Sequence, residues 1–584
     1  MKKFTFLVLA LVCSMSAFST RYLVELGTPG AATWTVTTGG TVVNLGTEGK
    51  TLNAWLTDVN ATLGSNEVWV AAGTYVFDGN YAVANGFTIY GGFAGTETTL
   101  AERVKGTNPW DFVNETTLDG NNAVRIFFLA GVRRSVFDGL TLTNGVSTEN
   151  NHGGALSLRA NATQRSIARY CKFINNSGTQ GGAVAIYSNG EVSDCYFYGN
   201  SAAIPEATSG LGGAIVITST GLSEGLPAKI SNCLFDSNEV VGQGGAIRSQ
   251  SPGAIIENCI FLNNSATAHG GAIYTQSGAT DANKIINCLV SGSKGQPAVY
   301  VRGASLYNCT LVDNVAGALR FNTEFGAVYN SVIWGETNAK ASVAVDANAT
   351  TTIFENNAYV VFPTNAWTAA DNIQLSISSA DANYPHFADD WSLTYQSVSL
   401  LNAADVATAT LTDIAGITRT QGGSADIGAY ELPYYTITVN EGENGTVTGD
   451  YAATEPQGKP IEYTITPAAG YVIGQVVYNV SNVTEDVVEG IYTALLLEDA
   501  TLNVTFAEKT GTGLNTLENA FTYFVQNNTL NLNGVLAGQI LTIYNVTGAK
   551  VLEQVISGNS HTVELNKGLY VVRLANSTAK VVIK

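Results

Sequence analysis

The stretch Cys259-Ile-Phe-Leu-Asn-Asn264, followed by Gly270-Gly-Ala-Ile273, decides the fold of this chain. Both motifs recur about every 28 residues, a spacing typical of repeat proteins whose units bury their apolar faces only by stacking. Gly-Gly-Ala begins at Gly153, Gly181, Gly212, Gly244 and Gly270, and the Cys motif begins at Cys171, Cys195, Cys233, Cys259, Cys288 and Cys309. Their joint recurrence predicts a solenoid between Asp119 and Trp334.

The alternation inside each repeat predicts the kind of solenoid. The residue after the Ala is aliphatic, as in Ile247 and Ile273, whereas the positions two and four past the Ala are mixed or polar. The Cys and the residue two positions later, such as Cys259 and Phe261, are both suited to a core. This period of two indicates short strands with one buried face, and stacked repeats place equal positions ~4.8 Å apart. We therefore predict a parallel β-helix.

An asparagine recurs five residues past the Cys. It stands at Asn176, Asn200, Asn238, Asn264 and Asn314, with Ser293 as the exception. Asparagine tolerates left-handed backbone in turns, and its amide can bond the same amide on neighbouring coils. Each repeat is expected to give at least two strands separated by turns, with these asparagines stacked along one turn.

The paired motifs resemble the repeat of the chlamydial-type polymorphic outer-membrane proteins. The resemblance rests on Gly270-Gly-Ala-Ile273 and Phe261-Leu-Asn-Asn264 and covers Asp119 to Trp334. It implies a right-handed β-helix displayed on a cell surface. We infer from it an adhesin-type protein that binds glycans or host and matrix surfaces.

The two ends of the chain indicate export. Lys2 and Lys3 precede the apolar stretch from Phe4 to Val12, which predicts a secretory signal peptide over residues 1–19. Beyond it, no stretch reaches the length of a membrane-spanning helix.

Residues 520–584 form short predicted strands between turns. Tyr544-Asn-Val-Thr-Gly548 and Gly568-Leu-Tyr-Val571 resemble the type A sorting domain of the type IX secretion system. The resemblance implies that the type IX secretion machinery is a partner. It also implies that the protein is secreted or lies on the outer-membrane surface of a Gram-negative bacterium.

The remaining regions complete an all-β chain, in which the β-helix is followed by two small β-sandwich-like modules. Leu52, Trp55, Leu56 and Val59 have the spacing of an amphipathic helix, which suits a cap over the first coil. The predicted order is a cap with the first strands (20–117), the repeats (118–335), a closing segment (336–432), a β-module resembling a divergent internalin-type B repeat (433–509), a linker (510–519) and the sorting domain (520–584).

Charge and cysteine content limit the possible partners. The chain carries 28 Lys+Arg against 47 Asp+Glu, a net charge of −19, which argues against nucleic acid as a partner. All six cysteines of the repeats occupy one inward position, where we expect a stacked ladder of mostly reduced thiols. Ligands spread along a column do not converge on one ion, so we expect neither a metal site nor a cofactor.

No catalytic constellation emerges from the residues, although β-helices also carry polysaccharide lyases and glycoside hydrolases, which stay open as the alternative function. The acids of the repeats, Asp119, Asp138, Asp194, Asp236, Glu257 and Asp313, fall at different positions. Asp194 precedes a Cys in a column that otherwise holds Asn232, Asn258, Asn287 and Asn308. His152 and His269 precede Gly-Gly and are interpreted as turn residues, and His386 and His561 stand apart.

One outward column is the candidate ligand-binding strip. It combines the positions two and four past the Ala and contains Arg248, Gln250, Tyr274, Gln276, Tyr300, Arg302 and Arg320. Tyrosine faces can stack on sugar rings, and arginine forks can hold carboxylate or sulfate, so we expect an anionic glycan as ligand. The alternative is that Tyr and Arg stand here because both suit an exposed pleated surface.

Overall fold

The computed structural model describes residues 21–35, 39–63, 66–83, 86–130, 134–148, 153–159, 163–188, 190–202, 210–218, 226–276, 283–322, 325–346, 349, 351–361, 368–509, 521–575 and 577–584. The predicted signal peptide and linker, His152 and most of the long turn after Ala202 lie outside these residues. The chain divides into two compact units. The first runs to Ile437 and includes Tyr451–Pro460 and Leu495–Asp499, and the second comprises Thr438–Asp450, Ile461–Ala494 and the chain from Ala500 onward.

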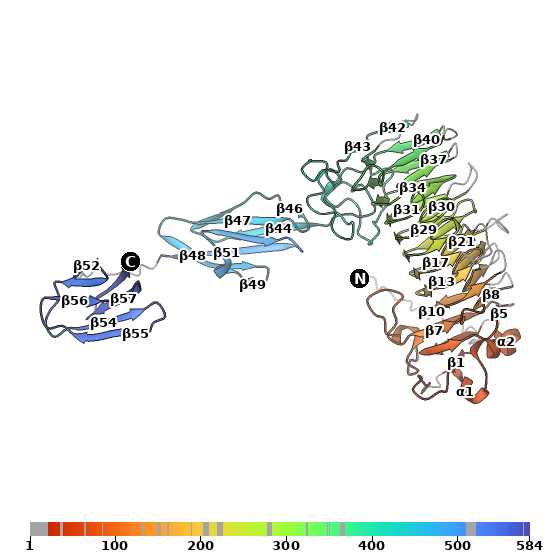
Figure 1. The fold of residues 1–584 in the computed structure, drawn as a ribbon, viewed down its shortest axis with the longest axis horizontal. Coiled ribbons are helices and arrows are strands. Elements are labelled where there is room, and N and C mark those ends of the chain that lie inside the picture. Colours follow the sequence, from red (N-terminus) through yellow and green to blue (C-terminus); the bar gives the residue numbers. More distant parts are fainter. Residues whose placement is uncertain are drawn as a thin grey trace, which may run out of the picture. The chain divides into compact units, whose positions relative to one another are not determined.

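Three long parallel sheets build the first unit, which confirms the predicted β-helix (Figure 1). In stacking order, sheet 1 contains β2 (Gly40–Asn44), β1 (Arg21–Glu25), β3 (Glu67–Ala71), β6 (Thr88–Phe93), β9 (Val136–Asp138), β13 (Ser166–Arg169), β17 (Gly190–Ser193), β22 (Lys229–Ser231), β27 (Ile255–Glu257), β31 (Asn283–Ile286), β34 (Ala304–Tyr307), β37 (Phe325–Tyr329), β40 (Thr351–Glu355) and β42 (Thr368–Ala370). Sheet 2 contains β4 (Gly73–Val76), β7 (Thr116–Asp119), β10 (Leu140–Thr143), β14 (Lys172–Ile174), β18 (Tyr196–Tyr198), β23 (Leu234–Asp236), β28 (Ile260–Leu262), β32 (Leu289–Ser291), β35 (Thr310–Val312), β38 (Val332–Trp334), β41 (Ala358–Tyr359) and β43 (Ile373–Gln374). Sheet 3 contains β5 (Tyr81–Val83), β8 (Phe127–Leu129), β12 (Leu156–Arg159), β16 (Val184–Ser188), β21 (Ile215–Ile217), β26 (Ile247–Ser249), β30 (Ile273–Thr275), β33 (Val299–Val301), β36 (Leu319–Phe321) and β39 (Val343–Val345).

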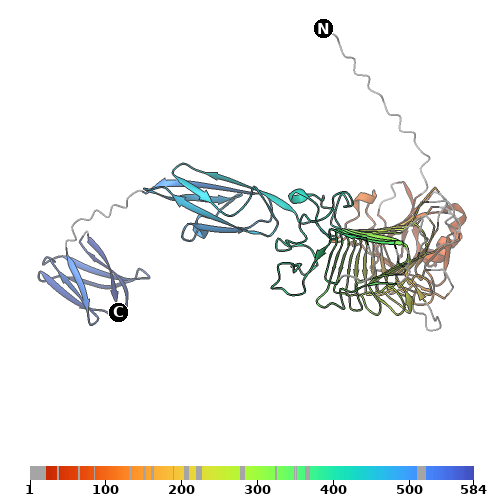
Figure 2. The ribbon, with the colours of Figure 1, turned by 90° about the horizontal axis from the view of Figure 1, so that it is seen from above.

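Short strands mark the turns between these sheets, and the ladders are visible as parallel rows in Figure 2. One short parallel sheet contains β11 (Val146–Ser147), β15 (Ser177–Gly178), β19 (Ser201–Ala202), β24 (Glu239–Val240) and β29 (Ser265–Ala266), and another pairs β20 (Gly210–Leu211) with β25 (Gly242–Gln243). The helices and 3-10 turns are α1 (Leu45–Glu48), α2 (Leu52–Leu63), η1 (Leu100–Glu102), η2 (Gln421–Gly423) and η3 (Thr484–Asp486).

The Gly-Gly-Ala motif is explained by the turn into sheet 3. Gly244 has a φ of 75°, a left-handed conformation that side chains rarely adopt. A Cβ on Gly245 would collide with the carbonyl oxygen of Gly271 on the next coil. The first glycine of the pair is therefore needed for its backbone conformation, and the second for the close approach of two coils.

The core is a set of stacked columns, as the alternation predicted. The cysteines of the repeats are fully or almost fully buried, and burial raises the pKa of Cys288 and Cys309 well above the usual range. Phe197, Phe235 and Phe261 stack face to face, with ring centroids 4.7 and 4.8 Å apart. In-register stacking thus brings side chains from the same repeat position of successive coils into contact along the axis.

The predicted asparagine ladder is present in the turn after sheet 2. Asn200 donates through Nδ2 to Asn238 Oδ1 at 2.9 Å, and Asn238 donates to Asn264 Oδ1 at 3.0 Å. The conformational part of the expectation was wrong, because the left-handed residue is the one before each ladder asparagine, such as Ser237 or Asn263. The ladder asparagine itself is buried, and its amide spans coils.

One end of the β-helix is capped, and one side is covered near the other end. Leu52, Trp55 and Leu56 of α2 pack into the main core, which confirms the amphipathic helix, although β1 and β2 precede it in the chain. At the other end, the closing segment packs a second apolar cluster against the outer face of sheet 2, in which Ile427 and Leu400 join Leu289 and Val332.

The strands beyond Leu432 are antiparallel. One five-stranded sheet contains β46 (Thr454–Pro456), β44 (Tyr434–Glu441), β51 (Ala500–Glu508), β48 (Tyr471–Tyr478) and β49 (Ser481–Asn482), and a three-stranded sheet contains β45 (Gly445–Thr448), β47 (Pro460–Pro467) and β50 (Ile491–Leu495). Two further sheets contain β52 (Thr522–Gln526), β53 (Thr529–Asn533) and β56 (Ser560–Glu564), and β55 (Lys550–Val555), β54 (Ile540–Asn545), β57 (Gly568–Leu574) and β58 (Ser577–Ile583). The last two sheets enclose a small core of their own, which includes Leu532, Ile543 and Val572.

Candidate functional site

The predicted strip lies on consecutive strands of sheet 3. Arg248 is in register with Tyr274, Tyr274 with Tyr300, and Tyr300 with Arg320. The strands β26, β30, β33 and β36 hold these side chains on their outer face, because the flanking aliphatic residues fill the core. The sequence pattern therefore identified correctly which residues become neighbours.

The side chains of the strip pack on one another. The Arg248 guanidinium lies 5.4 Å from the centre of the Tyr274 ring, and Arg320 lies 5.4 Å from that of Tyr300. The centres of the two tyrosine rings are 5.3 Å apart, and the rings are tilted by 46°. The His269 ring lies over Tyr300, with the ring centres 4.4 Å apart. Tyr274 is 2% exposed and Tyr300 3% exposed. The tyrosine faces are thus not free for a sugar ring, unlike the sequence-based expectation.

The arginines of the strip keep unused hydrogen-bond donors. Arg248 donates through Nε to Gln243 at 2.8 Å and through Nη2 to Gln276 at 2.9 Å, while its Nη1 is buried without a partner among the described residues. Arg302 reaches the Tyr274 hydroxyl at 3.5 Å, and its Nε likewise has no partner in the described part of the chain. Both atoms are buried, so an acceptor oxygen reaches these donors only when the side chains that cover them move aside.

Positive charge dominates around these donors. Burial, with the nearby charge of Arg302, lowers the pKa of Arg248 to about 10, so the guanidinium stays charged at neutral pH. Burial, with Arg320 and Arg302, lowers the pKa of His269 below its usual value. Arg320 is paired with Asp346 at 3.0 Å. Gln250 and Gln276 are half-buried at the edge of this cationic surface.

Sequence reasoning missed three contributors to the strip. His269 was interpreted only as a turn residue, Gln243 precedes a Gly-Gly pair, and Asp346 lies beyond the repeats. A signal for the first two existed, because both occupy the position before Gly-Gly on adjacent coils, and the structure pairs them in parallel. Only the stacking shows that this turn position faces the strip.

The acids of the repeats are engaged elsewhere. Asp138 is fully buried and contacts Arg103 at 2.8 Å and Arg169 at 2.6 Å. Glu257 pairs with Lys229, and Asp313 pairs with Lys340. Within the described residues, no group of three His, Cys, Asp or Glu side chains could hold a metal ion.

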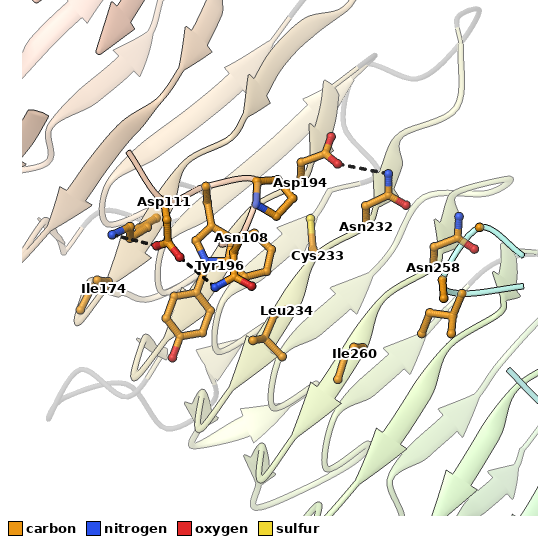
Figure 3. Close-up of a pocket in the computed structure, with 16 residues that line it drawn as sticks. Asn108, Asp111, Ile174, Asp194, Tyr196, Asn232, Cys233, Leu234, Asn258 and Ile260 are labelled. Carbon is orange, nitrogen blue, oxygen red and sulfur yellow. Dashed lines mark hydrogen bonds and ion pairs between the residues drawn. The ribbon is translucent and has the colours of Figure 1, made fainter. Parts of the chain in front are cut away.

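A groove of about 970 Å³ lies on a different face, along sheet 2 and the turn that precedes it (Figure 3). Its floor includes Tyr196, Leu234 and Ile260 on successive coils. Trp110 stacks on Tyr196 at 5.8 Å and closes one end, and the turn around Ala415 closes the other. No residue of this groove was predicted from the sequence to bind a ligand.

One edge of the groove is a polar row. Asp194, Asn232 and Asn258 follow one another on adjacent coils, and Asn232 donates to Asp194 at 3.3 Å. Near Trp110, Lys172 is held by Asp111 at 3.2 Å and Glu115 at 3.3 Å. This groove is therefore less cationic than the strip.

Comparisons with known proteins agree with the repeat. Residues 258–276 match the Chlamydia polymorphic membrane protein (Chlamydia_PMP) repeat. No curated protein matches the chain.

Among solved structures, a variant of the PL6 family alginate lyase AlyGC has a TM-score of 0.30 at 12% identity, covering 68% of this chain and 61% of the lyase. A second structure of AlyGC has a TM-score of 0.28 at 11% identity, covering 67% of this chain and 60% of the lyase. The ORF18 protein of Geobacillus virus E2 has a TM-score of 0.26 at 9% identity, covering 84% of this chain and 78% of that protein. The chain thus spans about three fifths of the lyase structures that it matches.

None of the helices that the structure describes combines the length and the apolar character needed to cross a bilayer.

Proposed function

We propose that this chain is an exported cell-surface or secreted β-helix protein that binds anionic glycans through the strip on sheet 3. The observation that carries the proposal is the buried Nη1 of Arg248, which lacks a partner among the described residues and lies within a cluster that also contains Arg302 and Arg320. Such a cluster stands out on a protein with a net charge of −19.

The chemistry of the strip favours carboxylate or sulfate groups. Guanidinium groups donate to such oxyanions in pairs, and partial burial strengthens the contact. The tyrosines hold the arginines in place by ring contact. In this proposal, the arginines bind the anionic groups and Tyr274 and Tyr300 act as positioning residues.

The test is retention of the protein on immobilised dextran sulfate and polygalacturonate, with uncharged dextran as the neutral probe. Replacing Arg248 and Arg302 together by Gln should weaken retention at least tenfold, because two charge-assisted contacts are lost. The matched control is Lys229→Gln with Lys284→Gln, which removes the same charge from sheet 1. Equal retention of the two double variants, both folded, would contradict the proposal.

The same incubation addresses the alternative function. A polysaccharide lyase would generate unsaturated ends and a glycoside hydrolase new reducing ends. Retention without new ends supports a binding protein. New ends that persist when Arg248 and Arg302 are replaced would assign catalysis to another part of the β-helix.

Export completes the proposal. The resemblance of the region from 520 to 584 to a type IX sorting domain supports secretion by that machinery. Its described part has its own core, formed by residues such as Leu530, Val563 and Ile583. A region with a core of its own suits a role as an address that is separate from the binding surface.

A further inference from the structure

A column of left-handed residues runs along the turn before sheet 2. We call it the turn column, and it contains Asp194, Asn232, Asn258, Asn287, Asn308 and Asn330. Each of them directly precedes the Cys that leads into a strand of sheet 2, except that Asn330 precedes a Ser. Their φ angles lie between 48° and 54°. Asparagine and aspartate are the side chains that best tolerate this conformation, which explains their recurrence. The conformation alone would also accept Gly, so it does not require the side-chain amides.

Half of the turn column is covered by the chain itself. Asn330 and the backbone of Asp405 bond reciprocally, since Asp405 N–H donates to Asn330 Oδ1 at 2.9 Å and Asn330 Nδ2 donates to the Asp405 carbonyl at 3.0 Å. On the next coils, Thr410 N–H donates to Asn308 Oδ1 at 3.2 Å, and Asn287 Nδ2 donates to the Thr412 carbonyl at 2.8 Å.

The closing segment therefore runs along the turn column as an extended stretch of polypeptide. Its backbone amides and carbonyls pair with side-chain amides, coil after coil. Asn287 is 3% exposed, and Asn308 and Asn330 are fully buried beneath it.

The other half of the turn column is open. The closing segment leaves the surface at the turn around Gly416, which has a φ of 84°. Beyond that turn, Asn232 is exposed and Asn258 is half-buried, and both line the groove (Figure 3). Asn232 Nδ2 donates to Asp194, and Asn258 Oδ1 accepts from Asn287 at 3.1 Å, whereas Asn232 Oδ1 and Asn258 Nδ2 have no partner among the described residues. The apolar floor also continues, because Leu234 and Ile260 follow Leu289 in the same column of sheet 2.

We propose that this groove binds an extended polypeptide segment, whose backbone pairs with Asn232 and Asn258 and which covers Leu234 and Ile260. The bound segment would continue the path that the closing segment takes over Asn330, Asn308 and Asn287. Three coils span ~10 to 15 Å, which accommodates about three or four extended residues between Trp110 and the Ala415 turn. This site is separate from the strip on sheet 3 and does not depend on the function proposed for it.

The contacts within the chain favour a peptide over a sugar. A side-chain amide offers one acceptor and one donor to the N–H and C=O groups of an extended residue, as the reciprocal pair of Asn330 with Asp405 shows. In the open half, Asn232 Oδ1 supplies the acceptor and Asn258 Nδ2 the donor. The same residue type, backbone conformation and apolar floor recur in the open half. The groove also lacks the arginine donors that mark the strip.

The experiment uses the full chain and a fluorescent peptide with the sequence Asp-Val-Ala-Thr-Ala-Thr-Leu-Thr-Asp, which copies residues 405–413. Saturable binding is expected by fluorescence anisotropy. Replacing Asn232 and Asn258 together by Gly keeps the left-handed backbone, as Gly139 does at this turn on an earlier coil, and removes both amides. The double variant should bind about tenfold more weakly, because two backbone pairs are lost.

The matched control is Asn263→Gly, an exposed left-handed asparagine outside the groove, which should bind the peptide as the wild type does. Thermal unfolding of both variants checks that the β-helix is intact. The proposal would be overturned if no binding is seen at about 1 mM peptide, which is roughly the dissociation constant of a very weak complex. Equal binding by the wild type and the double variant would overturn it as well. Binding of uncharged maltohexaose in place of the peptide would overturn it in favour of a sugar groove.

Discussion

At the scale of single residues, the two faces of a strand have opposite energetic roles. The inward face carries the stability of the solenoid, because side chains such as Phe235 and Phe261 are fully buried and stacked. The outward face carries the chemistry, because Arg248 and Arg302 hold donors without partners among the described residues. One residue of shift along the strand would exchange these roles.

Phe261→Ala should lower the free energy of unfolding of the β-helix by ~3 to 5 kcal/mol, because it removes a buried ring and leaves a cavity in a stack. Glu239→Ala, on an exposed position of β24, should change it by less than ~0.5 kcal/mol. Urea unfolding followed by circular dichroism compares the two. Equal effects would mean that the inward and outward assignment is incorrect.

At the scale of elements, the closing segment is held by buried charges. Arg419 is 2% exposed, and it lies among Asp413, Asp426 and Glu431, which are buried as well. Arg419 approaches Glu431 at 3.5 Å, and Asp426 accepts the backbone N–H groups of Asn402 at 2.6 Å and Leu432 at 2.8 Å. Three carboxyl groups around one guanidinium leave negative charge in excess.

This excess predicts a pH dependence for the closing segment. Burial, followed by the charge of Glu431, raises the pKa of Asp426 from its usual 3.8 to about 7. The folded state therefore holds a proton that the unfolded state releases, so stability present below pH 4 is lost as the pH rises toward 7. Hydrogen exchange of Ile427, corrected for the intrinsic rate, should show weaker protection at pH 8 than at pH 5.

Asp426→Asn is the control for that measurement. The amide cannot ionise, so protection of Ile427 should vary much less between the two pH values. Protection in the wild type that increases from pH 5 to pH 8 would show that Asp426 is charged in the folded protein at both values.

At the scale of the whole molecule, binding and export are assigned to different parts of the chain. Deleting Ala520 to Lys584 should leave a folded β-helix that accumulates in the periplasm, because the proposed address is lost and the main core is not. Cell fractionation with surface protease accessibility measures this. A reporter carrying the signal peptide and residues 520–584 should reach the surface. Undiminished surface display of the truncated protein would exclude the sorting assignment.

The sequence by itself determined the architecture of the β-helix. Alternation around Ile273 and Phe261 specified the inward face, and the recurrence of Gly-Gly-Ala specified the register in which Arg248, Tyr274 and Tyr300 become neighbours. This succeeds because a solenoid is quasi-one-dimensional, so that each coil contacts only the next and a periodic sequence maps directly onto space.

Only the tertiary structure decided what lies over the coils. His269 covers Tyr300, Trp110 reaches Tyr196, and Thr410 of the closing segment reaches Asn308. Each contact joins a repeat position to a residue of another column or from outside the repeats, so the period alone does not indicate it. Burial of the tyrosines and the open half of the turn column both follow from such contacts, and for that reason neither could be predicted from the sequence.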